Sequence, residues 1–539
     1  MKTVALLTIC GMAACAHAQY RSIDGTGNNL LSPQMGCVGS ELIRGASGAY
    51  YADGIGQPIA GPNVRTISNL LGAQTPAGLG NARNLSSWAW QWGQFIDHDF
   101  TLIDEGAEAM NIAIPTGDPV FDPMGTGTAV MPFHRSAFTQ GVTTPRQHAN
   151  AITHWIDGSN VYGSDTTRAT ALREGVGGRL ATSTGDMMPY NTGGLPNAGG
   201  PSPTMHLGGD IRANEQTGLL ATHTLFVREH NRIAGLIGAA NPGMGDEEIY
   251  QRARRMVGAE IQAITYNEWL PAMLGGHGLG SYAGYNDQTD ASIDTNFSTA
   301  AFRIGHTMLN DQLLRVEHGG AAYAGGHLSL FQSFFNPSVL AEPGSFDAVL
   351  RGLAYQEANE VDTQMIDGVR NLLFGGTSGR DLLALNLQRG RDHGIPDYNT
   401  LREDYGLAAV TSFDQITSDP ALAAALEAAY GDVDAIDAWI GLFAEDHLAG
   451  ASMGQTSAAI FRDQFGRLRE GDRFFYLNDP NLSPEELAFL ADLRLGDIIA
   501  LNTGITDLSG GSVFFTVPTP GAMGVLAMAG GLSARRRRR

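Results

Sequence analysis

The strongest constraint on the fold is a series of segments in which apolar residues recur at the spacing of an α-helix. Residues 219–237 and 246–274 show this pattern most clearly, because positions three or four apart lie on one face of a helix. The same reasoning predicts helices at 85–99, 298–309, 345–354, 363–373, 381–389, 420–430, 433–448, 457–468 and 483–496. Convincing strands are few. The pattern therefore predicts a mainly α fold.

Glycine is unusually frequent and indicates long loops between these helices. It accounts for 70 of the 539 residues, which is about twice its share of roughly 7% in average proteins. The 43% of hydrophobic residues is still enough to build a core. Residues 20–83 are expected to form an extended, irregular arm, and no repeat or low-complexity linker divides the body. Residues 19–510 are therefore expected to fold as a single domain.

Both ends of the sequence carry patterns typical of export. Lys2, a mostly apolar run at 4–15 and the motif Ala16-His17-Ala18 predict a signal peptide at residues 1–18. Residues 511–539 contain a short apolar run and five final arginines, and they resemble the PEP-CTERM sorting tail of bacterial proteins. The run is too short to cross a bilayer comfortably. We expect a bacterial protein exported to the cell surface or beyond, touching the membrane only transiently through its tail. A short basic membrane anchor is the alternative.

Charge and cysteine content exclude some partners. The chain has 34 basic and 55 acidic residues, and the two terminal segments contain basic residues but no acidic ones. Such an acidic body disfavours nucleic acid and anionic membranes as partners. Cys37 is the single cysteine outside the expected signal peptide, so the mature chain can form no internal disulfide, although an intermolecular one is open. No CxxCH motif occurs, which excludes c-type haem attachment. The sequence leaves the oligomeric state open.

The most informative motif ends the helix expected at 85–99. Its apolar, Trp-rich residues are followed by Asp97, His98 and Asp99, and Gln94 lies four residues before His98 on the same helix face. Three consecutive polar side chains at the end of an apolar helix are costly if they are buried without partners. Taken alone, the segment is explained more simply by a solvated helix end with a capping aspartate.

A second motif contains oxygen ligands that suit calcium. Thr153, Asp157 and Ser159 occupy alternate positions, with the Trp155 carbonyl between them, and oxygen ligands in a glycine-containing loop suit Ca²⁺. The loop supplies a single carboxylate, so a second must come from elsewhere, and Asp99 is available. An Asx turn explains this segment equally well when it is taken alone.

Three further motifs carry polar residues with an ordinary structural explanation for each. Arg212 and Glu215 are three residues apart, as in a surface ion pair of little energetic value. His306 stands alone in an apolar segment, where a core histidine is the default. Asn386 and Arg389 share a helix face. The asparagine could accept the N–H of a metal-bound histidine, and the arginine could pair with a carboxylate, including a haem propionate.

Together, and in this order, the five motifs closely resemble the animal-type haem peroxidases of the peroxidase–cyclooxygenase superfamily, such as myeloperoxidase, lactoperoxidase and peroxidasin. The resemblance extends through residues 20–29, 222–231, 264–271 and 464–474. It implies one large helical haem-peroxidase domain with haem b and Ca²⁺ as cofactors. It also implies an enzyme that reduces H₂O₂ and oxidises halide, thiocyanate or small organic donors through compound I.

The resemblance also implies roles for individual residues. His98 would be the distal acid–base, Gln94 would bond distal water or halide, and Arg212 would stabilise charge as the peroxide bond breaks. His306 would be the proximal iron ligand. Asn386 would bond the other nitrogen of His306.

Further implied positions surround the haem and the calcium ion. Arg303 and Arg389 would face the haem propionates, and Asp97 and Glu215 match the carboxylates that form haem esters. Gln216 stands where myeloperoxidase has a methionine that forms a third link, so bromide, iodide or thiocyanate is expected over chloride. The implied calcium ligands are Asp99, Thr153, Trp155 (through its carbonyl), Asp157 and Ser159.

Two other functions remain as alternatives. The first is a fatty-acid dioxygenase of the same superfamily, but those enzymes carry a radical-forming tyrosine three residues before the proximal histidine, where this chain has Arg303. The second is a Ca²⁺-binding surface protein that has lost catalysis, which would have no need of the complete set of polar residues. The disulfides of the secreted animal enzymes are absent, so stability is expected to rest on the helical core, haem and Ca²⁺.

Overall fold

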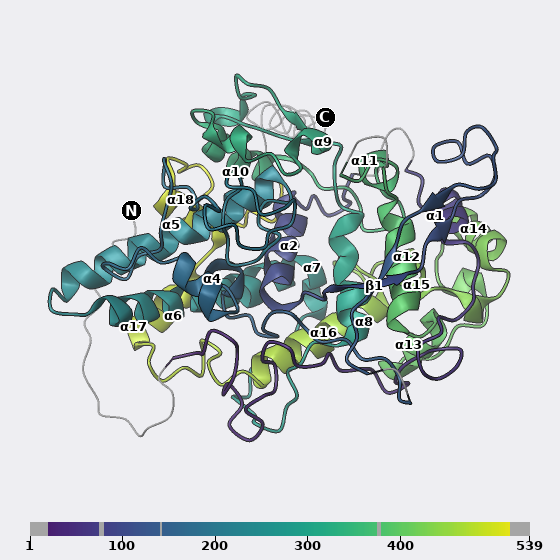
Figure 1. Cartoon of the computed structure of the whole chain (residues 1–539), viewed down its shortest axis with the longest axis horizontal. Helices are drawn as coiled ribbons and strands as arrows, with labels where there is room; N and C mark the ends of the chain where they lie inside the picture. Colours follow the sequence, from purple (N-terminus) through teal and green to yellow (C-terminus); the bar gives the residue numbers. More distant parts are fainter. Residues whose placement is uncertain (1–19, 75–79, 141–142, 375–378, 518–539) are drawn as a thin grey trace, which may run out of the picture.

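Helices dominate the computed structural model, which describes residues 20–74, 80–140, 143–374 and 379–517 (Figure 1). The α-helices are α1 (Val64–Leu71), α2 (Trp88–Phe100), α3 (Ser159–Tyr162), α4 (Thr166–Ala171), α5 (Thr217–Ala240), α6 (Asp246–Ile264), α7 (Leu270–Leu274), α8 (Thr295–Thr299), α9 (Leu330–Ser333), α10 (Ser345–Tyr355), α11 (Asp367–Arg370), α12 (Leu382–His393), α13 (Tyr398–Asp404), α14 (Pro420–Tyr430), α15 (Ala438–Ala444), α16 (Gln455–Glu470), α17 (Pro484–Asp492) and α18 (Leu495–Asn502). The mainly α fold with long loops is confirmed.

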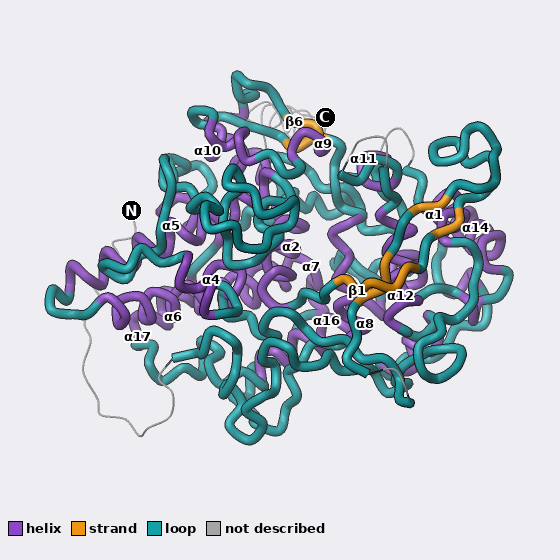
Figure 2. Tube along the Cα trace, in the orientation of Figure 1, coloured by secondary structure: helices purple, strands orange, loops and turns teal. Residues whose placement is uncertain are grey.

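Strands are few and short, as Figure 2 shows. They are β1 (Glu105–Ala109), β2 (Ile112–Ala113), β3 (Val130–Met131), β4 (His134–Ser136), β5 (Gln312–Leu313) and β6 (Leu328–Ser329). In the described residues they form antiparallel two-stranded pairs, β1 with β4, β2 with β3 and β5 with β6. None of these pairs builds a sheet large enough to carry a core, which is therefore made by helix packing.

Helix α2 lies at the centre of the molecule and packs against α3, α5, α10 and the 3₁₀ segment Ala301–His306. Its residues Trp88, Trp92 and Phe95 are fully buried, because neighbouring elements surround the helix. This burial explains why the apolar residues of α2 form no narrow stripe. The central position also brings the polar end of the helix, residues 97–99, into the interior.

Most of the expected helices occur, with boundaries shifted by a few residues. The expected helices at 219–237 and 345–354 correspond to α5 and α10, and 246–274 is one continuous helical stretch in which a π-helical turn, Thr265–Trp269, joins α6 to α7. Other expectations were too long. Only Asp367–Arg370 is helical within 363–373, and 483–496 divides into α17 and α18 at the extended residue Leu493. In the same way, 433–448 retains a 3₁₀ turn and α15.

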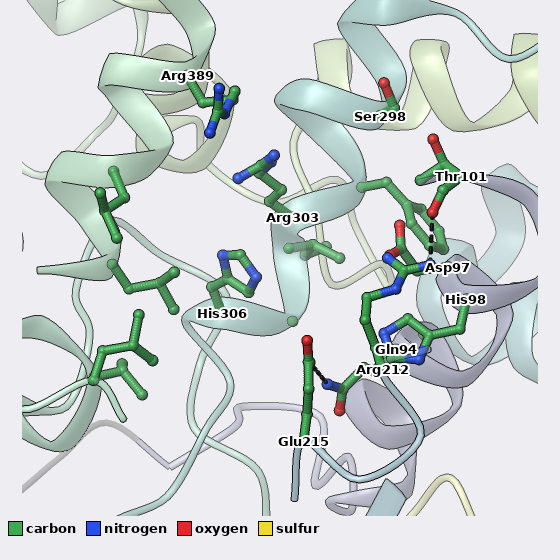
Figure 3. Close-up of a pocket in the computed structure, with 18 of the residues that line it drawn as sticks. Gln94, Asp97, His98, Thr101, Arg212, Glu215, Ser298, Arg303, His306 and Arg389 are labelled. Carbon is green, nitrogen blue, oxygen red and sulfur yellow. Dashed lines mark hydrogen bonds and ion pairs between the residues drawn. The ribbon is translucent and has the colours of Figure 1, made fainter. Parts of the chain in front are cut away.

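The segment at 298–309 departs most from expectation. Helix α8 ends at Thr299, and a 3₁₀ segment follows in which Arg303 has the non-helical angles φ −85° and ψ 15°. Gly305 lies against Trp90 of α2. A Cβ added to Gly305 would lie 3.4 Å from the Cβ of Trp90. The tighter turn packs on α2, and the side chains of Arg303 and His306 line a cavity (Figure 3).

The N-terminal arm contains a helix that the sequence analysis missed. Helix α1 begins after Asn63, whose side chain accepts a hydrogen bond from the Thr66 N–H at 2.9 Å. Its Arg65 is completely buried and binds Asp118 at 2.8 Å and Asp381 at 2.7 Å. Asp381 also caps α12. This network attaches the arm to the helix that carries Asn386 and Arg389.

The packed body continues past the expected domain end at residue 510. Val513 and Phe514 are buried, and Phe515 pairs with Leu85 just before α2. The predicted signal peptide and the residues of the predicted tail from 518 onward lie outside the described residues. Within the described ranges, no helix is long and apolar enough to cross a membrane. Cys37 is buried at 6% exposure, so an intermolecular disulfide would require a local rearrangement.

The Arg65→Met substitution tests the network beneath α1. Removing one partner from a buried ion pair leaves an uncompensated charge and costs about 3–5 kcal/mol, so the free energy of unfolding should fall by about that amount. Chemical denaturation followed by circular dichroism measures it. Arg179→Met is the matched control, because the Arg179–Glu174 pair is 41% and 45% exposed and such pairs contribute about 0–1 kcal/mol. Equal losses in the two variants would contradict the prediction.

Candidate functional site

A cavity of about 550 Å³ lies between α2, the loop before α5, the 3₁₀ segment and α12. Its volume lies within the range of ligand-binding pockets, roughly 300–1,000 Å³. We call it the main cavity. Figure 3 shows His98, Arg212 and Glu215 on one side and His306 with Arg303 on the other, across an open space. The fold therefore brings residues that are far apart in sequence onto facing walls of one pocket.

Asp210 organises the wall that carries His98. Its carboxylate accepts hydrogen bonds from Arg212 Nε at 2.8 Å and Nη2 at 3.0 Å, and its Oδ1 lies 3.7 Å from His98 Nδ1. Burial opposes ionisation of Asp210, but the Arg212 charge outweighs it, so the pKa of Asp210 is lowered. Sequence reasoning missed Asp210, although it stands two residues before Arg212. Arg212 also donates to the Thr101 carbonyl at 2.8 Å.

Burial makes His98 a weak base for its residue type. It lowers the pKa of His98 well below the ordinary value, and the nearby Arg212 charge lowers it further. The imidazole is therefore neutral at pH 7. Its Nδ1 is buried and makes no hydrogen bond within the described residues. The side chain lines the main cavity together with Gln94 and Arg212.

Two carboxyl groups, Asp97 and Glu215, also line the main cavity. Asp97 accepts a bond from Arg212 Nη1 at 3.1 Å, and Glu215 accepts one from Gln94 Nε2 at 3.1 Å. Burial raises the pKa of Asp97 to about 6 and that of Glu215 to about 7, despite the opposing Arg212 charge. Gln216 donates to Gln94 Oε1 at 3.2 Å, so hydrogen bonds hold both the oxygen and the nitrogen of the Gln94 amide.

His306 on the opposite wall is held by Asn386 of α12. The amide nitrogen of Asn386 lies 3.0 Å from His306 Nδ1, and its oxygen accepts a bond from Arg303 Nη1 at 2.9 Å. Burial, followed by the Arg303 charge, lowers the pKa of His306 to about 3. The imidazole is therefore neutral, which is the form that ligates a metal.

The edge of the cavity near α12 carries two guanidinium groups, Arg303 and Arg389. Burial lowers the pKa of Arg303 to about 10, and the like charge of Arg389 contributes. Arg389 has a carboxylate partner, Asp392, at 2.7 Å, whereas Arg303 binds only the neutral amide of Asn386 among the described residues. A buried cation with no carboxylate partner favours an anionic ligand at this edge.

We call residues 153–160, which include the oxygen ligands predicted to suit calcium, the calcium-type loop. This loop contacts the polar end of α2. Ser159 Oγ and the Asn160 N–H donate to Asp99 Oδ1 at 3.0 and 3.2 Å, and Thr153 Oγ1 donates to Asp157 Oδ1 at 3.2 Å. Asp99 and Asp157 are both buried, and the pKa of each is raised, first by burial. Asp157 Oδ2 is buried without a hydrogen-bond partner in the part of the chain that is described.

These observations fit both implied cofactors. A cation would neutralise the buried Asp99–Asp157 pair and use the unpartnered oxygen, and carboxylate and hydroxyl oxygens are ligands that Ca²⁺ prefers. The described residues contain no cluster of three or more His, Cys, Asp or Glu that could hold a metal, so such a site must rely on hydroxyl and carbonyl oxygens. The main cavity has the neutral imidazole and the cationic edge that a haem with two propionates requires.

Comparison with known proteins decides the family. The model of the animal haem peroxidase family matches residues 20–514. The chain belongs to the animal haem peroxidase family. It is therefore a haem peroxidase, an oxidoreductase that acts on H₂O₂ and an electron donor.

The relatives of this haem peroxidase cover it almost completely. Peroxinectin A of Dictyostelium discoideum is 35% identical over 478 residues, which are 85% of this chain and 89% of that protein. A peroxidasin homolog of Homo sapiens is 35% identical over 547 residues, which are 90% of this chain but 37% of that protein. The chain thus corresponds to most of the first relative and to little more than a third of the second.

Solved structures show the same fold. Peroxidase A from Dictyostelium discoideum superposes with a TM-score of 0.83 at 33% identity, covering 93% of this chain and 98% of that one. A fatty acid alpha-dioxygenase of Oryza sativa superposes with a TM-score of 0.77 at 23% identity, covering 92% and 87%. The second likeness concerns the fold alone. The peroxidase assignment therefore stands over the dioxygenase alternative, because the family model and a relative at 35% identity support it.

The Asp210→Asn substitution tests the residue that sequence reasoning missed. It removes the anion that orients Arg212, and loss of such a supporting partner typically costs about 10- to 100-fold in activity. Stopped-flow measurement of the rate constant with H₂O₂ should show a decrease of that size, after circular dichroism has verified folding. Asp104→Asn, an exposed neighbour of the same wall, is the control. An unchanged rate in Asp210→Asn would remove the supporting role.

Proposed function

We propose that His98, Arg212 and Gln94 form the peroxide-reacting side of this haem peroxidase and that His306 is its iron ligand. The single observation that supports this best is the placement of His98 and His306 on facing walls of the main cavity (Figure 3). A haem bound between them would supply the redox-active iron at which peroxide is reduced.

The proposed chemistry begins with a neutral imidazole. His98 takes a proton from the bound peroxide and returns it to the departing oxygen, so that it acts as general base and then as general acid. Its depressed pKa keeps it able to accept that proton at pH 7. Arg212, held rigidly by Asp210, stabilises the negative charge that develops between the two peroxide oxygens.

The proposed role of Asn386 is to orient the imidazole of His306. An imidazole that ligates through Nε2 carries its proton on Nδ1 and needs an acceptor there. The Asn386 amide lies 3.0 Å from His306 Nδ1, and its oxygen also accepts from Arg303. Asn386 would supply the acceptor for Nδ1–H, and Arg303 and Arg389 would hold the two haem carboxylates.

The donors that we propose are halide, thiocyanate and small organic molecules. Gln94 and Gln216 are joined by a 3.2 Å hydrogen bond beside the cavity, and an amide N–H can bind an anion or water. Gln216 has no sulfur, so the third covalent link of myeloperoxidase cannot form. We therefore place bromide, iodide and thiocyanate ahead of chloride as donors.

Substitution of the two histidines tests the proposed roles separately. His98→Ala should retain haem, with its absorption band, but react with H₂O₂ about 10²–10⁴-fold more slowly, as expected when a general acid–base is removed. His306→Ala should lose or strongly shift the absorption band itself. His148→Ala is the control, because His148 lies outside the main cavity. Normal peroxide rates in both cavity variants would contradict the assignment.

We further propose that Asp97 and Glu215 form ester bonds to haem. Both carboxyl groups line the main cavity, and their raised pKa values favour a protonated, weakly solvated form.

Acid-acetone extraction of the purified enzyme after turnover measures these bonds. Haem should stay with the wild-type protein, leave in part from Asp97→Asn and Glu215→Gln, and leave completely from the double variant. Glu105→Gln is the control, since Glu105 lines the same cavity but matches no ester position. Complete extraction of haem from the wild-type enzyme would contradict the proposal.

We also propose a calcium ion held by Asp99, Thr153, Trp155, Asp157 and Ser159. Asp99 directly follows His98, so a calcium ion would fix the end of α2 and with it the distal histidine. Chelation should lower both thermal stability and the rate with H₂O₂, and added Ca²⁺ should restore them. Mg²⁺ should not, because it demands stricter octahedral geometry. Full activity in protein that elemental analysis shows to be calcium-free would contradict the site.

The proposed location is the cell surface or the exterior of a bacterial cell, reached through a cleaved signal peptide and a sorting tail. The proposal is supported by the sequence patterns at 1–18 and 511–539. Packing of residues 513–517 on the domain moves the start of a removable tail to residue 518. Mass spectrometry of the exported protein would detect both cleavages.

A further inference from the structure

A fully buried tyrosine and histidine form a hydrogen bond that the proposed peroxide chemistry does not use. Tyr162 of α3 and His230 of α5 are both 0% exposed, and the Tyr162 hydroxyl lies 2.9 Å from His230 Nδ1. The other ring nitrogen of His230, Nε2, lies 2.8 Å from the Gly178 carbonyl oxygen. Because a carbonyl can only accept, Nε2 carries the hydrogen and Nδ1 is the acceptor. The Tyr162 hydroxyl is therefore the donor in its bond to His230.

Both partners of this hydrogen bond are uncharged at pH 7. Burial raises the pKa of Tyr162 well above its ordinary value, and burial lowers the pKa of His230 to about 4. A phenol that loses one electron becomes a much stronger acid, and a neutral imidazole within hydrogen-bond distance can accept its proton. The bond therefore allows Tyr162 to lose an electron and regain it while its proton moves to His230 and back.

A series of contacts links Tyr162 to the wall of the main cavity that carries His98. The rings of His98 and His223 lie 6.0 Å apart, and His223 Nδ1 lies 3.1 Å from the Asn160 carbonyl oxygen. Asn160 precedes Tyr162 by two residues in α3, and α3 packs against both α2 and α5. Tyr162 is thus connected to this wall through packed protein.

Tyr250 of α6 is the neighbouring buried tyrosine, and α6 lies beside α5 (Figure 1). The rings of Tyr162 and Tyr250 lie 6.0 Å apart, but the Tyr250 hydroxyl is buried without a hydrogen-bond partner in the described residues. The guanidinium carbon of Arg173 lies 4.1 Å from the centre of the Tyr250 ring. A nearby cation and the lack of a proton acceptor both oppose oxidation of Tyr250. Tyr162 is therefore the favoured site of electron loss.

We propose that Tyr162 is a redox-active residue that holds an oxidising equivalent when no donor is bound in the main cavity. One electron passes from Tyr162 to the peroxide-oxidised haem, which is thereby reduced by one equivalent, and the hydroxyl proton passes to His230 Nδ1. A small organic donor is then oxidised by one electron, which returns to Tyr162 together with the proton from His230. The inference rests on the proposed haem position between His98 and His306.

Electron paramagnetic resonance of the haem-loaded enzyme, frozen shortly after one equivalent of H₂O₂ is added without a donor, tests the proposal. The wild-type enzyme should show a tyrosyl radical, and isotopic labelling of the histidine nitrogens should reveal its magnetic coupling to an imidazole. Tyr162→Phe should lose this signal. Tyr250→Phe is the matched control and should retain it, because Tyr250 is buried beside Tyr162 but has no histidine partner.

Stopped-flow measurement of the reaction with H₂O₂ separates this inference from the proposed haem site. Tyr162→Phe should react at the wild-type rate, because Tyr162 does not line the main cavity, but its oxidised haem should persist longer without a donor. An unchanged radical signal in Tyr162→Phe, or an equal loss in Tyr250→Phe, would overturn the inference. If Tyr162→Phe does not fold, a wild-type radical without imidazole coupling would overturn it. A wild-type enzyme that fails to react with H₂O₂ would overturn the haem site, and the inference with it.

Discussion

The ion pair between Arg212 and the buried Asp210 is the interaction on which the wall of the main cavity that carries His98 depends. Arg212 also contacts Asp97 and the Thr101 carbonyl, so one guanidinium joins the loop before α5 to the end of α2. A charge inside a protein is tolerable only when it is paired and hydrogen-bonded. Asp210 meets this requirement and leaves an arginine fixed beside a neutral histidine. The protein itself therefore fixes this geometry, which is the kind of preorganisation that electrostatic catalysis requires.

Three consecutive residues at the end of α2, Asp97, His98 and Asp99, face different surroundings. Successive side chains on a helix point about 100° apart, so Asp97 and His98 reach the main cavity while Asp99 reaches the loop at 157–160 behind it. Asp99, directly after His98, bonds residues 158–160. This loop and the side chain of His98 are therefore attached to the same turn of one buried helix.

The opposite wall of the main cavity carries two neutral groups, His306 and Asn386, and the cation Arg303. Asn386 is fully buried, and its amide contacts both His306 and Arg303. Its position on α12 is secured by Asp381, which caps the helix and binds Arg65 of α1. The N-terminal arm therefore supports the wall that carries His306 from a distance, and Arg303 has no carboxylate partner among the described residues.

The sequence by itself determined the helical class, most helix positions and the residue types of the site, because these depend on local periodicity and on motifs of a few residues. It named His98, Arg212 and His306, but their arrangement in space depends on contacts such as those of Arg212 with Asp97 and of His306 with Asn386, which join residues 115 and 80 positions apart. Tertiary structure alone decided the 3₁₀ turn at 301–306, which packs on α2. It also decided the helix α1 around Arg65, the partner Asp210 and the packing of residues 513–517. Each depends on burial against distant residues, and burial sets the cost of an unpaired charge and the pKa of every group in the site.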